Sequence, residues 1–211
     1  MRSNLCFSGL GAGENPPVAA VRVTGGLWGE RLRVNREITL PAEYEQYQKT
    51  GHLDAWKLTW KPGDPKRPHI FWDSDVAKWL EAAGYSLALH PDPELEKRCD
   101  EVIGWMAAAQ QPDGYLNTYY IVVEPDKRWS NLRDCHELYC AGHLMEAAVA
   151  YFEGTGKRLF LDVMCKYADY IAKVFGRGEN QLRGYPGHEE IEIALVKLAR
   201  AAGEKRYLDL A

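Results

Sequence analysis

The sequence predicts an all-α protein whose helices form two concentric layers, an α/α toroid present here as an incomplete ring of about three helix hairpins. The predicted helices alternate between segments that are apolar on nearly every face and segments with one apolar stripe. Inner helices of a ring contact neighbours on all sides, whereas outer helices face water. Short sequence blocks also recur along the chain. An open α-solenoid is the alternative architecture.

The part of the chain before residue 71 carries weaker signals. Residues 1–17, rich in Gly, Asn and Pro, predict a loose lead-in, and residues 18–211 form the domain. Two stretches, 18–23 and 32–40, favour β structure because branched apolar residues recur in them. Pro41 then opens a short helix that Gly51 ends, and the Lys- and Pro-rich residues that follow predict a long loop up to residue 70.

The first predicted hairpin joins a buried helix over 75–89 to an amphipathic helix over 93–109. Apolar residues cover nearly every face of the first helix. The second helix has a single apolar stripe, formed by Leu95, Cys99, Val102, Ile103 and Met106. We therefore expect the first helix in the inner layer and the second in the outer layer.

The same alternation follows twice more. Residues 136–153 are apolar almost all round, and residues 157–174 are amphipathic. A third buried helix is predicted to begin near His188, with its outer partner starting close to Tyr207. Two pairs of blocks support the repeat: WLEAA at 79–83 with LMEAA at 144–148, and GKRLFLD at 156–162 with EKRYLDL at 204–210.

Polar residues gather where the buried helices begin. If these helices run in one direction, their N-termini open at the same end of the ring. The acidic residues there are explained by capping and by the positive helix end. An imidazolium is disfavoured at that end, whereas a neutral imidazole can both donate to and accept from a hydroxyl group. We therefore predict that His136 and His188 bind substrate, together with Trp72 and Asp75 from the first of these segments.

Two loop stretches are further candidates for the same opening. Tyr115, Asn117, Tyr119 and Tyr120 follow a Pro-Asp-Gly turn, and Trp129 and Arg133 could serve as a platform and an anchor for a sugar. The alternative for these stretches is a packed surface loop.

A metal site is not the favoured interpretation of the histidine-rich helix. His136, Cys140 and His143 would share one helix face, but Cys140 stands where the zinc motif H-E-x-x-H requires its second histidine. Because the helix is otherwise apolar, Cys140 is predicted to be a small core residue and His143 a hydrogen-bonded core histidine.

Composition narrows the class of protein. The 211 residues are 46% apolar and 27% charged with a net charge of −4, which is ordinary for a globular protein and offers no basic surface for nucleic acid. No apolar run reaches the ~20 residues that a membrane-spanning helix needs. The first residues do not resemble a secretory signal, and five cysteines without a CxxC pair favour reduced thiols. We therefore expect a cytoplasmic protein.

Four long stretches resemble glycoside hydrolase family 127: FWDSDVAKWLEAAGYSLA, AAAQQPDGYLNTYY, NLRDCHELYCAGHLMEAAVAYFEGTGKRLFLDVMCKYADYI and GYPGHEEIEIALVKLARAAGEKRYLDLA. The resemblance covers about residues 20–211 and implies the amino-terminal half of an (α/α)6 catalytic barrel. It also implies retaining hydrolysis of terminal beta-L-arabinofuranosides by a cysteine nucleophile and a glutamate acid/base, with a zinc ion held by cysteines and a glutamate. His136 and His188 match the family's sugar-binding histidines.

In the family, the catalytic groups and the zinc ligands lie beyond the position that matches Ala211, and no cysteine of this chain matches them. We therefore expect no catalytic residue and no metal ligand here, only groups that bind an arabinofuranoside. Pro186 and Glu189 stand where relatives often carry Cys and Gln. An incomplete ring would also leave inner helices exposed, which predicts self-association.

Two other functions fit parts of the sequence. A non-catalytic helical-repeat module could bind a sugar or a peptide on its concave face. Another (α/α)6 sugar enzyme, such as an epimerase or an unsaturated glucuronyl hydrolase, would need its own catalytic His or Asp pair in these helices.

Overall fold

The computed structural model describes residues 16–211, and regular structure there is helical apart from one isolated bridge between Phe175 and Leu182. The all-α prediction is therefore confirmed. Most of the predicted lead-in, together with Cys6, lies outside the described residues. Among the residues described, no helix is both long enough and apolar enough to cross a membrane.

The two stretches that favoured β structure do not form strands. Residues Val18–Ala20 form a 3-10 turn, and α1 (Gly26–Val34) passes through a π-helical turn (Asn35–Thr39) into α2 (Leu40–Thr50). The β prediction was wrong for both stretches, and tertiary packing explains the helix only at Leu40, the one residue of the two stretches that is buried. Leu40 is fully buried, its carbonyl accepts a hydrogen bond from the Trp79 indole at 3.0 Å, and the Tyr44 ring lies 5.3 Å from the Trp79 ring.

The segment after α2 agrees with the sequence in outline. The helix ends at Gly51, as predicted, and only the short α3 (His52–Ala55) interrupts the irregular chain that leads to α4.

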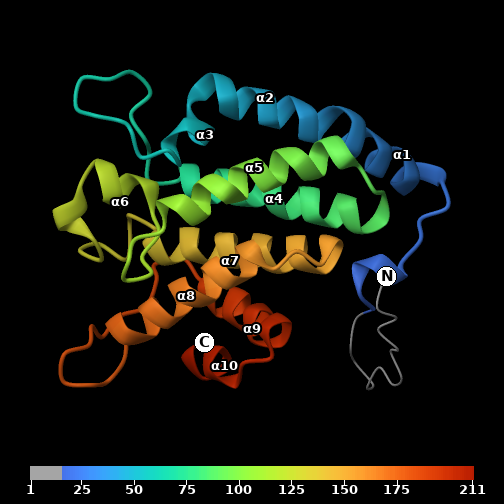
Figure 1. Ribbon diagram of the computed structural model, residues 1–211. Coiled ribbons are helices and arrows are strands. Elements are labelled where there is room, and N and C mark those ends of the chain that lie inside the picture. The colour runs from blue at the N-terminus through green and yellow to red at the C-terminus, as the bar shows by residue number, and fades with distance from the viewer. Residues whose placement is uncertain (1–15) are drawn as a thin grey trace.

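Three hairpins make up the rest of the chain, as Figure 1 shows. They are α4 (Trp72–Leu89) with α5 (Pro93–Ala109), α7 (Glu137–Thr155) with α8 (Leu159–Val174), and α9 (Ile191–Ala202) with α10 (Lys205–Leu210). The short α6 (Thr118–Val122) and a 3-10 turn (Pro125–Lys127) lie in the connection between the first two hairpins. All five residues of the predicted stripe on α5 are buried. The alternation of inner and outer helices is thus confirmed for the first two hairpins, α4 with α5 and α7 with α8.

The third inner helix is less buried than predicted. Ile191, Ala194, Leu195 and Leu198 are buried, but Ile193 is 57% exposed and Arg200 is also exposed. The helix packs on α7, α8 and α10, so the face that bears Ile193 has no neighbour among the described residues. The apolar residues on every face of this helix predicted complete burial, but a face is buried only where another helix packs against it.

The inner helices run in the same direction. Near the start of α7 the Cys140 thiol donates to the carbonyl of Ile70 at 3.3 Å, and further along both helices Gly84 contacts the backbone of Ala150. A Cβ at Gly84 would lie 2.8 Å from the Ala150 carbonyl carbon, so only glycine permits this approach. Helices α4 and α7 are therefore parallel and closely packed.

Helix α9 continues the parallel arrangement. The Glu190 carboxyl, at its start, lies 3.3 Å from the His143 ring, and Lys197, further along, forms an ion pair with Glu146. All three inner N-termini therefore open at the same end, as the sequence predicts.

Two buried carboxylates hold the connection 110–136 against this end. Asp73 accepts hydrogen bonds from the Thr118 backbone N–H at 2.8 Å and from its hydroxyl at 2.6 Å. Glu137 accepts from the Tyr115 hydroxyl and from the Trp129 backbone N–H, both at 2.6 Å. Neither α4 nor α7 has a side-chain cap, so the capping role predicted for these acids is replaced by loop anchoring.

Burial changes the ionisation of both groups. Desolvation raises the pKa of Asp73 to about 6 and the pKa of Glu137 to about 7, although their hydrogen bonds favour the charged form.

We expect Asp73→Ala to destabilise the protein. It leaves the N–H and hydroxyl of Thr118, which is fully buried, without their acceptor, at a cost of roughly 1–3 kcal/mol. Urea denaturation would measure the loss. The matched control is Asp126→Ala, which removes an exposed carboxylate from the same connection. Equal unfolding midpoints for the two variants would contradict the anchoring role.

Loss of the Glu137 proton should lower the free energy of unfolding as pH rises. Its folded pKa of about 7 lies above the ordinary value of 4.5, so the folded state binds a proton more tightly than the unfolded state between these limits. The stability that this proton contributes is lost as pH rises through about 7. Glu137→Gln cannot titrate, so its urea midpoint should change less than that of the wild type between about pH 5 and 8. Parallel pH profiles would show that this carboxyl is not responsible.

Candidate functional site

The two histidines singled out from the sequence lie side by side. Their ring centroids are 5.8 Å apart and the planes make an angle of 75°. His136 is half-buried at the N-cap of α7, and His188 is exposed in the loop just before α9. The structure thus places both imidazoles at the shared end of the inner helices, where one small ligand could contact both.

The backbone at His136 adopts a left-handed conformation. Its φ of 57° is uncommon for a residue other than glycine, and its carbonyl already accepts the first helical hydrogen bond, from Cys140 N at 3.0 Å. The Phe71 ring packs edge to face with the imidazole, with ring centroids 5.0 Å apart. Tertiary contacts therefore stabilise an unusual backbone turn at the residue that caps α7.

A glycine brings the two histidine segments together. The Gly187 N–H donates to the Leu132 carbonyl at 3.2 Å, and a Cβ at Gly187 would lie only 2.4 Å from the Arg133 carbonyl oxygen. Only a residue without a side chain fits there. In the sequence, the one sign of this role is that Gly187 directly precedes a candidate histidine.

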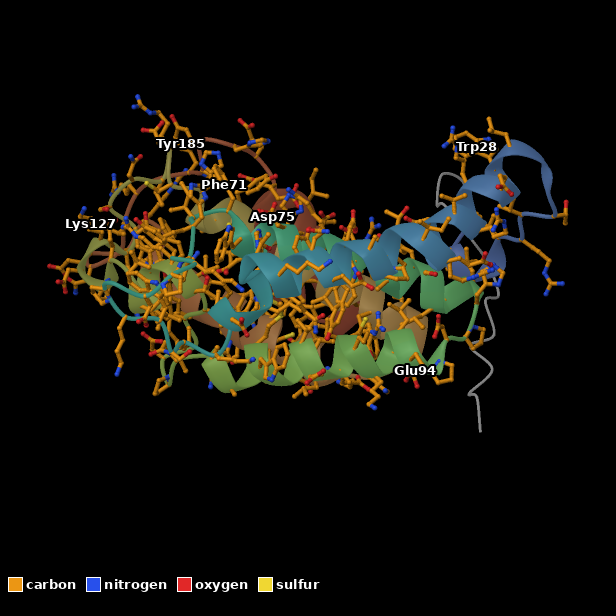
Figure 2. The ribbon with its side chains drawn as sticks, turned by 90° about the horizontal axis from the view of Figure 1, so that it is seen from above. Trp28, Phe71, Asp75, Glu94, Lys127 and Tyr185 are labelled. Atoms are coloured by element: carbon orange, nitrogen blue, oxygen red, sulfur yellow. The ribbon has the colours of Figure 1, made fainter. Side chains whose placement is uncertain are left out.

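Trp72 and Asp75 lie on the first turn of α4, at the shared end of the inner helices, and both contact His52. The His52 ring stacks on Trp72 with centroids 4.3 Å apart, and its Nε2 lies 3.5 Å from the Asp75 carboxylate. Figure 2 shows Phe71, Asp75 and Tyr185 at the same end of the molecule, away from Glu94. His52 therefore lies against Trp72 and Asp75, a contact that nothing in its local sequence indicated.

Several other expected lining residues are structural. Tyr115 and Tyr120 are buried, and Asn117 caps α6 by accepting from the Tyr120 N–H at 3.0 Å. Trp129 packs edge to face against Tyr115 and Phe175 instead of forming an open platform. For these residues the packed-loop alternative is correct.

A polar cluster lies one turn deeper along the inner helices. Desolvation lowers the pKa of His143 to about 4, so its ring is neutral at pH 7. Desolvation and the neighbouring Glu146 raise the pKa of Glu190 to about 8, and Glu146 is paired with Lys197. His143 therefore faces polar groups, and its Nδ1 has no hydrogen-bond partner within the described residues. Among the described residues the predicted hydrogen bond is thus absent at Nδ1, and the ring, with its side chain only 13% exposed, lies among polar groups at the edge of the core.

The same cluster has the composition of a cation site. Possible ligand atoms of Glu81, His143 and Glu146 all lie within 4.8 Å of one another. The Lys197 ammonium group already provides a positive charge at Glu146, so we assign no ion to it.

The described cysteines do not fit the zinc site that the resemblance implies. Cys99 and Cys140 are buried, and desolvation raises the pKa of both thiols above the ordinary value. Cys135 and Cys165 lie on separate segments, before α7 and on α8. A structural or catalytic zinc ion needs three or four ligands around one point. The buried thiol of Cys140 confirms its interpretation as a small core residue.

Parallel inner helices, each packed against an outer helix and beginning at the same end, define the chain as part of an α/α toroid, with imidazole, indole and carboxylate groups at that end. The chain belongs to glycoside hydrolase family 127: the family model for the beta-L-arabinofuranosidase GH127 catalytic domain matches residues 20–211.

Relatives of known activity and structure agree. The chain is 50% identical over 145 residues to the non-reducing end beta-L-arabinofuranosidase of Bifidobacterium longum subsp. longum, a match that covers 67% of this chain and 22% of that protein. The crystal structure of a GH127 beta-L-arabinofuranosidase from Geobacillus stearothermophilus T6 is 52% identical, with a TM-score of 0.85 over 90% of this chain and 31% of its own. A second GH127 beta-arabinofuranosidase structure is 39% identical, with a TM-score of 0.86 over 92% of this chain and 32% of its own. The chain thus spans about a third or less of the length of these relatives.

We expect Gly187→Ala to separate the two histidine segments. The added methyl group overlaps the Arg133 carbonyl, and relieving such an overlap costs roughly 1–3 kcal/mol. Nuclear Overhauser contacts between the rings of His136 and His188 should weaken in the variant. Gly104→Ala is the control, because a Cβ there meets nothing within 4 Å. Unchanged ring contacts in Gly187→Ala would show that this close approach does not hold the pair.

Proposed function

We propose that this chain supplies part of the sugar-binding site of a retaining glycoside hydrolase that acts on terminal beta-L-arabinofuranosides. The observation that carries the proposal is the pair of imidazoles, His136 and His188, at the common end of the inner helices. The names of the relatives, arabinofuranosidases in each case, support the choice of sugar.

The proposed site has the chemistry that a furanoside requires. A neutral imidazole donates from one nitrogen and accepts at the other, so two such rings can bind adjacent hydroxyl groups. Asp75 adds a carboxylate acceptor, and Trp72 adds an aromatic ring, one face of which is covered by His52. These groups orient a sugar without performing the reaction.

We assign no catalytic residue to the described residues. Retaining hydrolysis needs a nucleophile and an acid/base group on either side of the glycosidic bond, and a cysteine nucleophile must be kept ionised. Burial favours the neutral thiol at Cys99 and Cys140, which is the opposite of what a nucleophile requires. We therefore propose that none of the described residues serves as the nucleophile, the acid/base glutamate or a zinc ligand.

Two lesser expectations remain predictions. We propose a cytoplasmic location, since the described cysteines are free thiols. Self-association through the exposed side of the inner helices is expected from Ile193 on α9.

The test is binding and turnover by the purified chain. Methyl beta-L-arabinofuranoside should bind, and His136→Ala and His188→Ala should each weaken binding roughly tenfold, the effect of about 1.4 kcal/mol. His90→Ala is the matched control, since His90 is exposed at the opposite end of α4. A p-nitrophenyl beta-L-arabinofuranoside should not be hydrolysed.

The binding site and the absence of catalytic residues can be disproved separately. If the sugar does not bind, or if all three histidine variants bind it equally, the binding site is wrong. If the chain hydrolyses the substrate and His136→Ala abolishes turnover, the division between binding and catalysis is wrong. Binding without turnover also fits a non-catalytic sugar-binding module.

A further inference from the structure

We infer that Tyr139, held in place by Lys78, is a positioning residue that sets the relative orientation of His136 and His188. The consequence for sugar binding rests on the proposed function, whereas the effect on the two imidazoles does not.

The Tyr139 ring contacts both histidines of the pair. Its centroid lies 5.5 Å from that of His136, at an angle of 73°, and 4.7 Å from that of His188, at 39°. It also lies 4.4 Å from the His143 ring, edge to face, one turn deeper. These distances are typical of favourable aromatic contacts. One ring therefore supports three imidazoles.

Tyr139 connects segments that are far apart in the sequence. His136, Tyr139 and His143 follow one another at i, i+3 and i+7, so they share a face of the helix start. His188 comes from the loop before α9, and among the described residues its aromatic contacts are with His136 and Tyr139. His188 is otherwise exposed, so these two aromatic contacts restrict the orientation of its ring.

Lys78 fixes the tyrosine from the neighbouring helix. Its ammonium group donates to the Tyr139 hydroxyl at 2.9 Å and lies 5.1 Å from the ring centroid. The hydroxyl oxygen is thus occupied as an acceptor, and its O–H remains available to donate. Lys78 is an exposed residue of α4, so the bond joins two inner helices at their open end.

Different substitutions separate the ring from the hydroxyl. Tyr139→Leu removes the aromatic ring, whereas Tyr139→Phe keeps the ring and removes only the bond to Lys78. Lys78→Met removes the same bond from the other side. Because Tyr139→Phe and Lys78→Met delete one interaction, their effects should not add in the double variant. Tyr185→Leu is the control, since Tyr185 is 84% exposed in the loop that carries His188.

The experiment uses the 211-residue chain with labelled histidines. In the absence of ligand, Tyr139→Leu should shift the imidazole signals of His136 and His188 and weaken the contact between their rings, while Tyr139→Phe largely restores both. Binding of methyl beta-L-arabinofuranoside should weaken roughly tenfold in Tyr139→Leu. It should weaken about threefold in Tyr139→Phe, in Lys78→Met and in the double variant. Tyr185→Leu should match the wild type.

Three results would overturn the inference. They are unchanged imidazole signals in Tyr139→Leu, equal losses in Tyr139→Leu and Tyr139→Phe, and additive losses in the double variant. If Tyr139→Leu fails to fold, Tyr139→Phe and Lys78→Met still test the positioning role. A tyrosine that only stabilises the fold would leave the His188 imidazole signals unchanged in both variants. If the wild type binds no sugar, the proposed function fails, and the ligand-free spectra still test the positioning role.

Discussion

Close parallel packing of α4 against α7 is the constraint on which the rest of the structure depends. At Gly84 the backbones of the two helices touch, and at the other end the Cys140 thiol bonds to the carbonyl of Ile70. These two contacts fix the direction of both helices. Helix α9 follows the same direction through its ion pair between Lys197 and Glu146. Every inner helix consequently begins at the same end, and every connection from an outer helix returns there.

Gathering the helix N-termini at one end has an electrostatic consequence. The partial positive charges of the helix ends lie close together, and anions are favoured near them. Asp73 and Glu137 meet this requirement while they hold the connection 110–136 in place. Burial opposes their ionisation and leaves the pKa of each within about a unit of neutrality. The same residues therefore serve the helix ends, the loop and the pH response of the fold.

The candidate site is built on this foundation by contacts between loops. His136 adopts an unusual backbone turn, His188 is brought near by the close approach of Gly187, and the Tyr139 ring lies against both. Beneath them, the ring of His143 is neutral at pH 7 because burial disfavours its charge. Membership of glycoside hydrolase family 127 places this arrangement among proteins whose relatives include arabinofuranosidases.

The sequence by itself determined the helices of the three hairpins, the buried and exposed faces of the first two, and the two histidines near the helix starts, because periodicity and helix-end chemistry act within a few residues. The tertiary structure alone decided the rest. Leu40 lies in a helix because α4 covers it, Trp129 is packed because Phe175 reaches it, and Gly187 and Tyr139 gain their roles from distant segments. A local pattern shows that a face is apolar or that a group is polar, but the partner that meets it comes from elsewhere in the chain.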